Sequence, residues 1–488
     1  MPSLSFPRTP ISEITYTSLP ESFYQFTNPT PVADPKVIFW NEGLADEFQF
    51  SDWNKQEETT AKFFSGSSLP DGIRPFAQAY AGHQFGHFTM LGDGRTIVMG
   101  EFQNRKGEWF DFQWKGSGRT KYSRNGDGRA TISAMVREYI MSEAMAGLQI
   151  PTTRSLAVVK TGEPVLREEV QEGAVLTRVA SSHIRVGTFE YAYQALSLDE
   201  LEALFRYTVN RHTPELMSAE NPALSFLEFV MKRQVTLVTH WMRVGFIHGV
   251  MNTDNMSIAG ETIDYGPCAF MNGYFGKRVF SSIDANGRYA FANQMGIAQW
   301  NLACLTNSLL PLIDPNEEKA IELAKAKLNE LEMWFQESYI RMLGEKIGFP
   351  NLTEKDLPLL RNLYQWMQDR EADFTNTFLV LEGVYKPKET IYQDSRWKDW
   401  VKDWQEEKKK QGIREEDAIS LMQKSNPSFI PRNHMVEIAL ANVRQGQMSV
   451  AETLIKRSQN PYIRELGYDY GEEVPQGGDG NYQTFCGT

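Results

Sequence analysis

The chain has 488 residues, and its 50 Lys and Arg against 62 Asp and Glu give a formal net charge of −12. This acidic balance argues against nucleic acid as a main partner, and no run of about twenty apolar residues predicts a transmembrane helix. Three cysteines exclude a disulfide framework and the N-terminus lacks the pattern of a signal or transit peptide, so we expect a cytoplasmic protein with no membrane partner.

Residues 1–75 are rich in Pro, Ser and aromatic side chains. We expect them to form an N-terminal extension on the surface of the first lobe, with a short helix over 41–48. Between Phe85 and Lys115 the runs HFTM, TIVMGEFQN and EWFDFQWK are typical of strands, and turn residues separate them. This pattern predicts an antiparallel meander at the start of an N-terminal lobe that spans 76–190.

The segment LGDGR at 91–95 has two interpretations. An Asp-Gly pair between strands is a strong hairpin signal. Glycines also allow backbone N–H groups to approach phosphates, although the full G-x-G-x-x-G spacing is missing. Gly92, Gly94 and Arg95 are therefore candidates for a nucleotide loop only in combination with other features.

Lys115 ends the third strand, and six Lys or Arg against one Asp, Asp127, occur from Lys115 to Arg137. In an acidic chain this local excess predicts an anion site. A helix expected over 131–148 carries Glu138, and kinases place a phosphate-binding Lys and its Glu partner in this order. The alternatives are a solvated Lys115 and a Glu138 that pairs with Arg137 on the helix surface.

The segment 155–165 predicts another strand pair, and Arg178 and Arg185 follow it seven residues apart. The planar guanidinium donates two parallel hydrogen bonds, which suits phosphate oxygens. Ordinary surface salt bridges are the alternative. Two amphipathic helices, over 197–217 and 222–244, then open a helical lobe that we place at 191–345.

The second of these helices leads into GFIHGVMNTDNMSIAGETIDYG at 245–266. In kinases a His opens the catalytic loop, an Asp two residues later is the base, and an Asn five residues after that Asp and the Asp of a D-x-G hold metal ions. His248, Asn255 and Asp264 match this spacing. Val250 stands where the base belongs and cannot take a proton.

Further helices are expected beyond this loop, in the rest of the helical lobe and in a C-terminal extension at 346–488. The tail at 467–488 is expected to be irregular. The predicted helices span 296–312, 317–344, 355–370, 396–411 and 434–456.

Together these runs closely resemble the selenoprotein O family of kinase-fold proteins, over nearly the whole chain. The resemblance implies an α+β, two-lobed protein-kinase-like fold with a mostly antiparallel β N-lobe, a helical C-lobe and a helical C-terminal extension. The matching motifs are LGDGRT, WKGSGRTKYSRNGDGRA, LTRVASSHIR, HGVMNTDNMSI with IDYGP, PRNH at 431–434 and the terminal FCGT.

The family resemblance further implies a protein adenylyltransferase that binds ATP in an inverted orientation. It would transfer AMP to Ser, Thr or Tyr hydroxyls of proteins and release pyrophosphate. Asp254 would be the proton acceptor, Asn255 and Asp264 would hold Mg²⁺, with Mn²⁺ as the alternative ion, and a monomer is expected. The nucleotide would contact Gly92, Gly94, Arg95, Lys115, Asp127, Gly128, Glu138, Arg178, Arg185 and Asp264.

Two other function classes stay open from the residues alone. One is a phosphotransferase of the kinase type, which Val250 disfavours. The other is a non-catalytic nucleotide-binding pseudokinase, which the retained Lys115, Asn255 and Asp264 disfavour. Related chains often end in a Cys-x-x-Cys or Cys-x-x-selenocysteine pair, whereas this chain ends Cys486-Gly487-Thr488. A regulatory disulfide between Cys268 and Cys486 is a further hypothesis.

Overall fold

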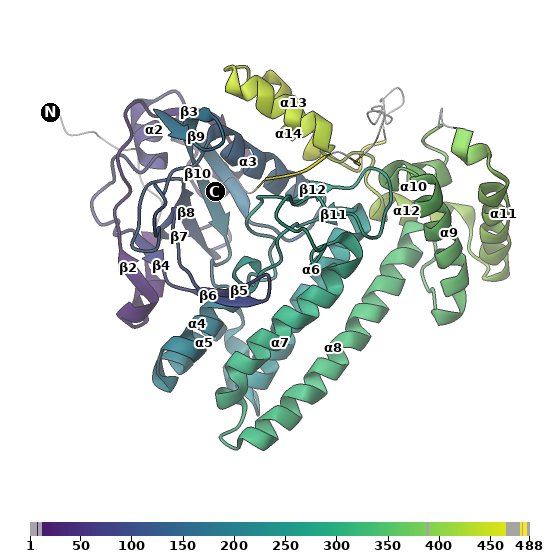
Figure 1. Cartoon of the computed structure of the whole chain (residues 1–488), viewed down its shortest axis with the longest axis horizontal. Helices are drawn as coiled ribbons and strands as arrows, with labels where there is room; N and C mark the ends of the chain where they lie inside the picture. The colour runs from purple at the N-terminus through teal and green to yellow at the C-terminus, as the bar shows by residue number, and fades with distance from the viewer. Residues whose placement is uncertain (1–6, 8–11, 387–389, 465–478, 481, 486–488) are drawn as a thin grey trace.

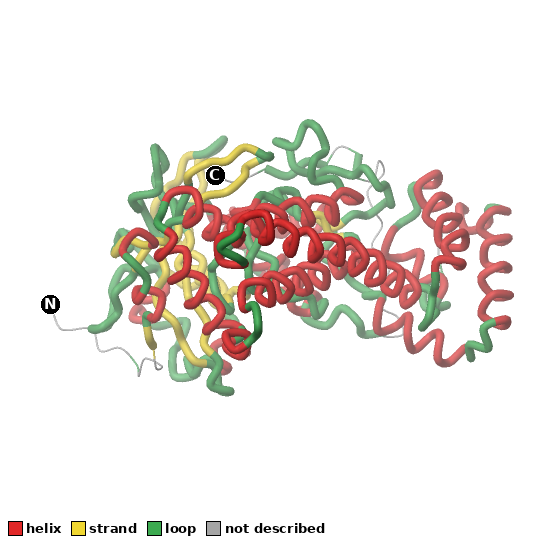
Figure 2. The backbone as a smooth tube through the Cα atoms, turned by 90° about the horizontal axis from the view of Figure 1, so that it is seen from below, coloured by secondary structure: helices red, strands yellow, loops and turns green. Residues whose placement is uncertain are grey.

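The computed structural model describes residues 7, 12–386, 390–464, 479–480 and 482–485. The strands gather at the N-terminal end of the molecule, long helices extend from them, and a further group of helices lies at the far end (Figures 1 and 2). The last two helices return to the strand-rich end, so both ends of the described chain contribute to one lobe.

An eight-stranded antiparallel sheet forms the N-terminal lobe. Its order is β2-β4-β7-β8-β10-β9-β3, and β1 pairs with β7. The first 75 residues thus supply three strands of the sheet, so they are more than the surface extension we expected. The strands are β1 (Ser12–Glu13), β2 (Tyr24–Phe26), β3 (Lys36–Trp40), β4 (Phe76–Gln78), β7 (Thr96–Gln103), β8 (Trp109–Lys115), β9 (Arg154–Leu166) and β10 (Val170–Ala180).

The predicted three-strand meander is wrong at its first strand. β6 (His87–Met90) pairs with β5 (Ala81–Gln84) in a separate hairpin, and only β7 and β8 pair with each other. β7 already has β4 on one side and β8 on the other, so no edge is left for β6. The strand pair predicted within 155–165 is likewise a single long strand, β9, which pairs with β10.

Helices cover both faces of this sheet. α3 (Ile132–Gly147) packs on one face through Met135, Val136 and Ile140, which recur at helical spacing, so the helix predicted over 131–148 is confirmed. α1 (Glu42–Glu47), predicted over 41–48, and α2 (Glu58–Phe64) cover the other face. An aromatic cluster there includes Phe50, Phe63, Phe64, Phe112 and Trp114.

The helical lobe is built on α6 (Pro222–Val244), which packs against α7 (Gln294–Ile313) and α8 (Glu317–Lys346) (Figure 1). Asn221 caps the N-terminus of α6 by accepting from the Leu224 amide at 3.0 Å. α4 (Val186–Ala195) and α5 (Leu198–His212) lie beside it. The predictions for α6, α7 and α8 are confirmed to within two residues at each end.

The C-terminal helices form two groups. α9 (Leu357–Arg370), α10 (Phe374–Leu381), α11 (Ser395–Lys410) and α12 (Glu415–Ser425) form the distal group, whereas α13 (Asn433–Arg444) and α14 (Ser449–Ser458) pack on α3 (Figure 1). The single helix predicted over 434–456 is wrong, because Gly446 adopts a φ of 77° after α13. α10 and α12 were not predicted. Most of the tail at 467–488 lies outside the described residues.

This arrangement confirms the predicted fold class, which is α+β, two-lobed and kinase-like. It consists of an antiparallel sheet, the helix α3 packed on one face of that sheet, and a second lobe made of helices. The loop between α6 and α7 lies where the two lobes meet, since Arg185, which follows the sheet, bonds to it directly. Within the described part of the chain no helix has both the length and the apolarity needed to cross a membrane.

Gly245 should contribute to stability because it ends α6 immediately before that loop. Its φ is 73°, and a Cβ there would lie 2.8 Å from Cδ1 of Phe374. We expect Gly245→Ala to lower the free energy of unfolding by about 2 kcal/mol, through backbone strain and overpacking together. Denaturant titration measures the change.

Gly412→Ala is the matched control, because Gly412 has a φ of 69° and nothing within 4 Å of an added Cβ. In this variant the free energy of unfolding should fall by about 1 kcal/mol, because only the strain of the left-handed backbone is added. Equal losses in the two variants would contradict the steric part of this account.

Candidate active site

Lys115, at the end of β8, forms a buried ion pair with Glu138 of α3 through a 2.6 Å contact between Nζ and Oε2. The predicted pair is confirmed, and the solvated Lys115 is excluded. Arg137 instead pairs with Glu437 at 2.9 Å, so Glu138 is not its partner. Burial lowers the pKa of Lys115, and the neighbouring Arg178 lowers it further.

Arg178 and Arg185 are buried, so neither forms an ordinary surface salt bridge. Arg178, on β10, donates to Oε1 of Glu138 at 2.5 Å and to Oδ1 of Asp264 at 2.7 Å. Arg185 donates from one nitrogen, Nη1, to Oδ2 of Asp264 at 2.5 Å and to the Asp254 carbonyl oxygen at 2.5 Å.

Asp264 is therefore the common partner of three cations, since Nζ of Lys115 also lies 3.2 Å from its Oδ1. Burial alone would raise the pKa of Asp264, but Arg185, Arg178 and Lys115 hold it well below its usual range. The side chain is still 24% exposed. The carboxylate is therefore ionised and partly exposed to solvent.

Internal hydrogen bonds hold the loop between α6 and α7 in shape. His248 donates through Nε2 to the Ile263 carbonyl at 2.9 Å, and burial lowers its pKa, so its ring is neutral. The Asn255 amide nitrogen donates to the Val250 carbonyl at 3.0 Å. Val250 is buried, and it places an apolar side chain where kinases have a carboxylate.

Asp254 is a buried carboxylate with little hydrogen bonding. Among the described residues Oδ1 has no partner, and Oδ2 has only Nε2 of Gln84 at 3.5 Å. Burial raises the pKa of Asp254 to about 6, and Arg185 opposes that rise. A weakly solvated carboxylate with a free oxygen is suited to accept a proton.

β5 covers Asp254, and sequence reasoning missed this. A Cβ on Gly82 would lie 2.4 Å from Oδ1 of Asp254, so only a glycine allows the strand to approach this closely. The His83 amide donates to Oγ1 of Thr253 at 2.7 Å, and the Phe85 amide donates to Oδ1 of Asn252 at 3.0 Å. No local pattern in AGHQ pointed to this contact with a loop about 170 residues away.

Asn255 and Asp264 fit a hard divalent cation by their chemistry. The side-chain nitrogen of Asn255 donates to the Val250 carbonyl, so the side-chain oxygen of Asn255 is the atom that could bind a metal ion. The ionised, partly exposed Asp264 supplies carboxylate oxygens, and amide and carboxylate oxygens are ligands that Mg²⁺ accepts.

The segment after β8 donates hydrogen bonds to the carbonyl oxygens of the predicted nucleotide loop. The carbonyl of Asp93 accepts from Oγ1 of Thr120, and that of Gly94 accepts from Oγ of Ser123, each at 2.5 Å. The Arg95 carbonyl accepts from the Gly116 amide at 2.7 Å. These bonds fix Gly92 to Arg95 beside the end of β8.

Asp127 and Gly128 lie on the same Gly-rich segment. Asp127 pairs with Arg167 at 2.8 Å, and its side chain is 47% exposed. The Gly128 carbonyl accepts from the Gly118 amide at 3.0 Å. A cavity of about 710 Å³ opens nearby, and its lining includes Arg167 together with Arg95, Lys115 and Glu138 from the predicted set.

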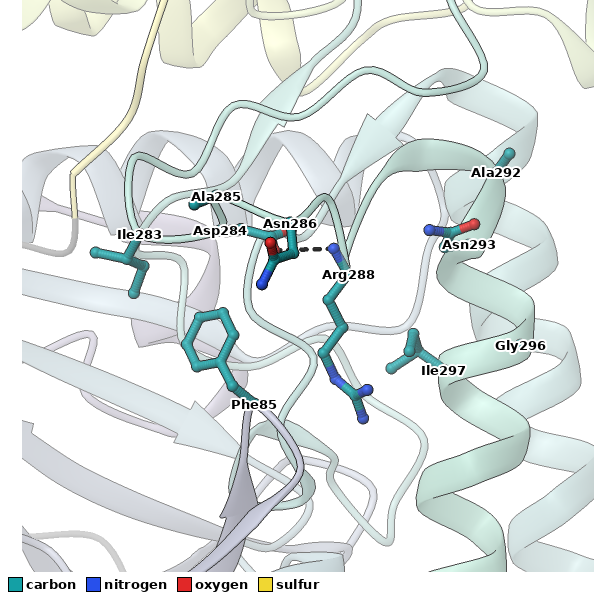
Figure 3. A pocket seen from close by; sticks show the side chains of 10 residues that line it. All are labelled: Phe85, Ile283, Asp284, Ala285, Asn286, Arg288, Ala292, Asn293, Gly296 and Ile297. Carbon is teal, nitrogen blue, oxygen red and sulfur yellow. Dashed lines mark hydrogen bonds between the residues drawn. The ribbon is translucent and has the colours of Figure 1, made fainter.

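A second cavity, of about 680 Å³, is lined by Phe85 and by residues of the segment 283–297 (Figure 3). Phe85 and Arg288 point into it, and the Arg288 amide donates to Oδ1 of Asp284 at 2.9 Å. Tyr289, next to Arg288, donates through its hydroxyl to Asn252 at 2.5 Å. This cavity therefore adjoins the segment that carries Asp254.

The hypothesis of a Cys268–Cys486 disulfide stays untested. Cys268 is buried, and its carbonyl accepts from Arg137 at 2.9 Å. Cys486 lies outside the described residues.

Comparison with known proteins gives consistent matches. The family model described as "Protein adenylyltransferase SelO" matches residues 11–459. The chain is 46% identical over 474 residues to "Protein nucleotidyltransferase YdiU" of Pelagibacter ubique, covering 97% of this chain and 98% of the relative. Proteins of the same name are 47% identical in Bacillus thuringiensis (97% of each chain) and in Clostridium perfringens (98% of this chain, 97% of the relative).

A solved structure is also similar: ROP2 of Toxoplasma gondii, titled a virulence factor with a protein-kinase fold and no enzymatic activity. It is 11% identical, with 75% of this chain and 92% of that chain covered, and its TM-score of 0.23 supports no conclusion about this chain.

Glu138 should be essential to stability because it is the shared anion of Lys115 and Arg178. In Glu138→Gln the amide N–H group would face a cation, and two buried charges would lose their nearest counter-charge. We expect the free energy of unfolding to fall by about 3 kcal/mol. Thermal and denaturant unfolding measure the change.

Glu437→Gln is the matched control, since Glu437 pairs with the adjacent Arg137 but is 47% exposed. The free energy of unfolding should fall by no more than about 1 kcal/mol in this variant. If both variants have the stability of the wild type, the buried network does not hold the lobe together.

Proposed function

We propose that this chain, which belongs to the SelO family of protein adenylyltransferases, transfers AMP from ATP to Ser, Thr or Tyr hydroxyls of proteins and releases pyrophosphate. One observation supports the choice of Asp254 as the residue that accepts the proton. The kinase base position is the buried, apolar Val250, whereas Asp254 four residues later has a buried carboxylate oxygen without a hydrogen-bond partner among the described residues.

Asp254 is the proton acceptor in this proposal. The acceptor hydroxyl loses its proton to a carboxylate oxygen of Asp254 while its oxygen attacks the α-phosphorus of ATP. The bond between the α-phosphorus and the bridging oxygen to the β-phosphorus breaks, and pyrophosphate leaves. General-base assistance of this kind is worth about a hundred- to ten-thousand-fold in rate.

The cations around Asp264 hold the phosphates. Lys115, Arg178 and Arg185 contribute three positive charges against the two carboxylates of Glu138 and Asp264, so 3 − 2 leaves one net positive charge before Arg95 is counted. Preorganised cations of this kind stabilise the charge that develops on a leaving pyrophosphate. In this proposal Gly92, Gly94, Asp127 and Gly128 would contact the nucleotide from the two Gly-rich segments.

The cavity beside Lys115 is the proposed nucleotide pocket. Its volume of about 710 Å³ lies within the usual range of ligand sites, about 300–1,000 Å³. Asn255 and Asp264 would hold Mg²⁺, or Mn²⁺ in its place, and the bound ion would neutralise charge on the phosphates.

The acceptor protein enters, in this proposal, through the cavity of Figure 3. That cavity adjoins Asn252, two residues before Asp254, and among the described residues its lining shares none with the cavity beside Lys115. Asp284 and Arg288 there supply polar groups of both signs, and Phe85 and Ile297 supply apolar contacts for a peptide segment. Nucleotide and acceptor would thus reach Asp254 from different openings.

The proposal is tested with ATP labelled separately at the α- and γ-phosphates and incubated with acceptor proteins and Mg²⁺. The α-label should enter protein, and pyrophosphate should be released. Asp254→Asn should reduce the transfer by about a hundredfold or more while ATP binding is kept. Asp264→Asn, which retains the shape of the side chain, should abolish metal-dependent transfer.

Transfer of the γ-label alone would identify a kinase with an unusual base. ATP binding without any transfer, in conditions where a related enzyme is active, would identify a nucleotide-binding scaffold. Gln445→Glu, a change in the exposed turn after α13, serves as a surface control and should keep the wild-type rate.

A further inference from the structure

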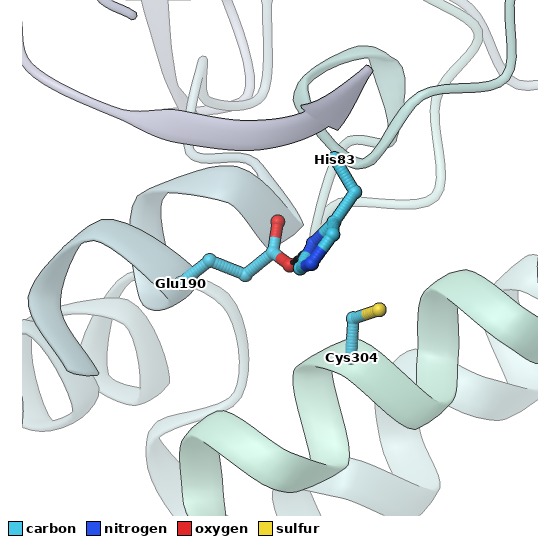
Figure 4. Close-up of side chains that lie close together, drawn as sticks. All are labelled: His83, Glu190 and Cys304. Carbon is cyan, nitrogen blue, oxygen red and sulfur yellow. Dashed lines mark hydrogen bonds and ion pairs between the residues drawn. The ribbon is translucent and has the colours of Figure 1, made fainter. Parts of the chain in front are cut away.

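His83, Glu190 and Cys304 converge on one point behind the catalytic loop (Figure 4). They come from β5, α4 and α7, and their ligand atoms all lie within 4.8 Å of one another. Nδ1 of His83 contacts Oε1 of Glu190 directly. Among the described residues this is the one such group of three His, Cys, Asp or Glu side chains.

Glu190 supplies an independent sign of a cation-binding site. Its side chain is 3% exposed, and within the described part of the chain its Oε2 has no hydrogen-bond partner. A buried polar atom without a partner destabilises a folded protein. The binding of a metal ion would give this oxygen a partner.

The cluster also has room for a ligand. A cavity of about 260 Å³ is lined by His83, Glu190 and Cys304, together with Trp300, Asn307 and Ser308. Its walls combine an aromatic ring with polar side chains, so a water molecule in the cavity would find hydrogen-bond partners beside the three side chains.

We propose that His83, Glu190 and Cys304 bind one Zn²⁺ ion, with a water molecule from the adjoining cavity as the fourth ligand. Imidazole nitrogen, carboxylate oxygen and thiolate sulfur are the three protein ligand types that Zn²⁺ takes in tetrahedral sites. Mg²⁺ prefers oxygen ligands alone, so this site is chemically distinct from the one at Asn255 and Asp264.

Binding requires only local changes. Ligand atoms of a tetrahedral Zn²⁺ site lie about 3.3–3.8 Å apart, so small side-chain rotations bring the three groups within reach. The direct contact between His83 and Glu190 is replaced by two bonds to the metal. As the Zn–S bond forms, the Cys304 thiol releases its proton to solvent and the hydrated ion gives up water molecules.

A redox-active thiol is the alternative role for Cys304. Its Sγ lies within 4.8 Å of a ring nitrogen of His83 and a carboxylate oxygen of Glu190, and among the described residues the lining of the adjoining cavity contains no second cysteine. This geometry favours a metal ligand over a disulfide-forming cysteine.

The metal would stabilise the catalytic loop through the elements that pack against it. The His83 amide already bonds Thr253, Gly82 packs against Asp254, and Glu190 lies on α4, which begins directly after Arg185. One ion would thus join β5, α4 and α7 around the residues that hold Asp254. This role is separate from the proposed AMP transfer and does not depend on it.

Co²⁺ is the probe, because a cobalt–thiolate bond gives a charge-transfer absorption band in the near ultraviolet. The full-length protein, freed of metal by a chelator and titrated with Co²⁺, should develop this band with one ion bound per chain. Zn²⁺ should then displace Co²⁺ and raise the melting temperature. Cys304→Ser should abolish the band, and His83→Asn should weaken Co²⁺ binding by about a hundredfold or more.

Cys486→Ser is the matched control and should keep the band, since it removes a different thiol. Glu190→Gln keeps the thiol and the side-chain shape, so it tests the site even if Cys304→Ser folds poorly, and it should weaken binding. No band in the wild type, a band that persists in Cys304→Ser, wild-type affinity in Glu190→Gln, or loss of the band in Cys486→Ser would each overturn the proposal.

Discussion

The structure depends on the charge cluster around Asp264. Lys115 from β8 and Arg178 from β10 approach this carboxylate from the sheet, and Arg185 approaches it from the start of α4. Glu138 of α3 holds the same Lys115 and Arg178 from behind. The cluster thereby joins the sheet, its inner helix and the catalytic loop of the helical lobe.

Such a cluster is costly to bury, since desolvation of several charges opposes their mutual attraction. An apolar contact between the lobes would hold them together without that cost. The arrangement is understandable if the charges have a second task, which is to meet phosphates and a metal ion in the cleft. Asp264 would then exchange part of its contacts with Lys115, Arg178 and Arg185 for contacts with the phosphates and the metal ion. The contact between the two lobes would therefore change when the nucleotide binds.

The sequence predicted the ion pair of Lys115 with Glu138 correctly, whereas it predicted the strand pairing of the sheet only in part. The helices α3, α6 and α8 have apolar residues at helical spacing, and the order of Lys115, Glu138, His248 and Asp264 follows from local motifs. The contact of β5 with Asp254 joins segments about 170 residues apart, and the strand pattern showed neither this contact nor that β6 pairs with β5 alone. Arg178 and Arg185 were candidates by type, but their shared carboxylate became visible only in three dimensions.

The loop that carries Val250 and Asp254 separates this chemistry from that of a kinase. Asp254 is buried beneath β5, and Arg185 joins its carbonyl oxygen to Asp264, which Lys115 and Arg178 also contact. We propose that these cations hold the β- and γ-phosphates as the leaving group while the acceptor hydroxyl attacks the α-phosphorus. A crystal structure with Mg²⁺ and a non-hydrolysable ATP analogue tests this most directly. The account predicts the α-phosphorus nearest the Asp254 carboxylate, with the terminal phosphates at Lys115 and the arginines; a γ-phosphorus facing Asp254 would contradict it.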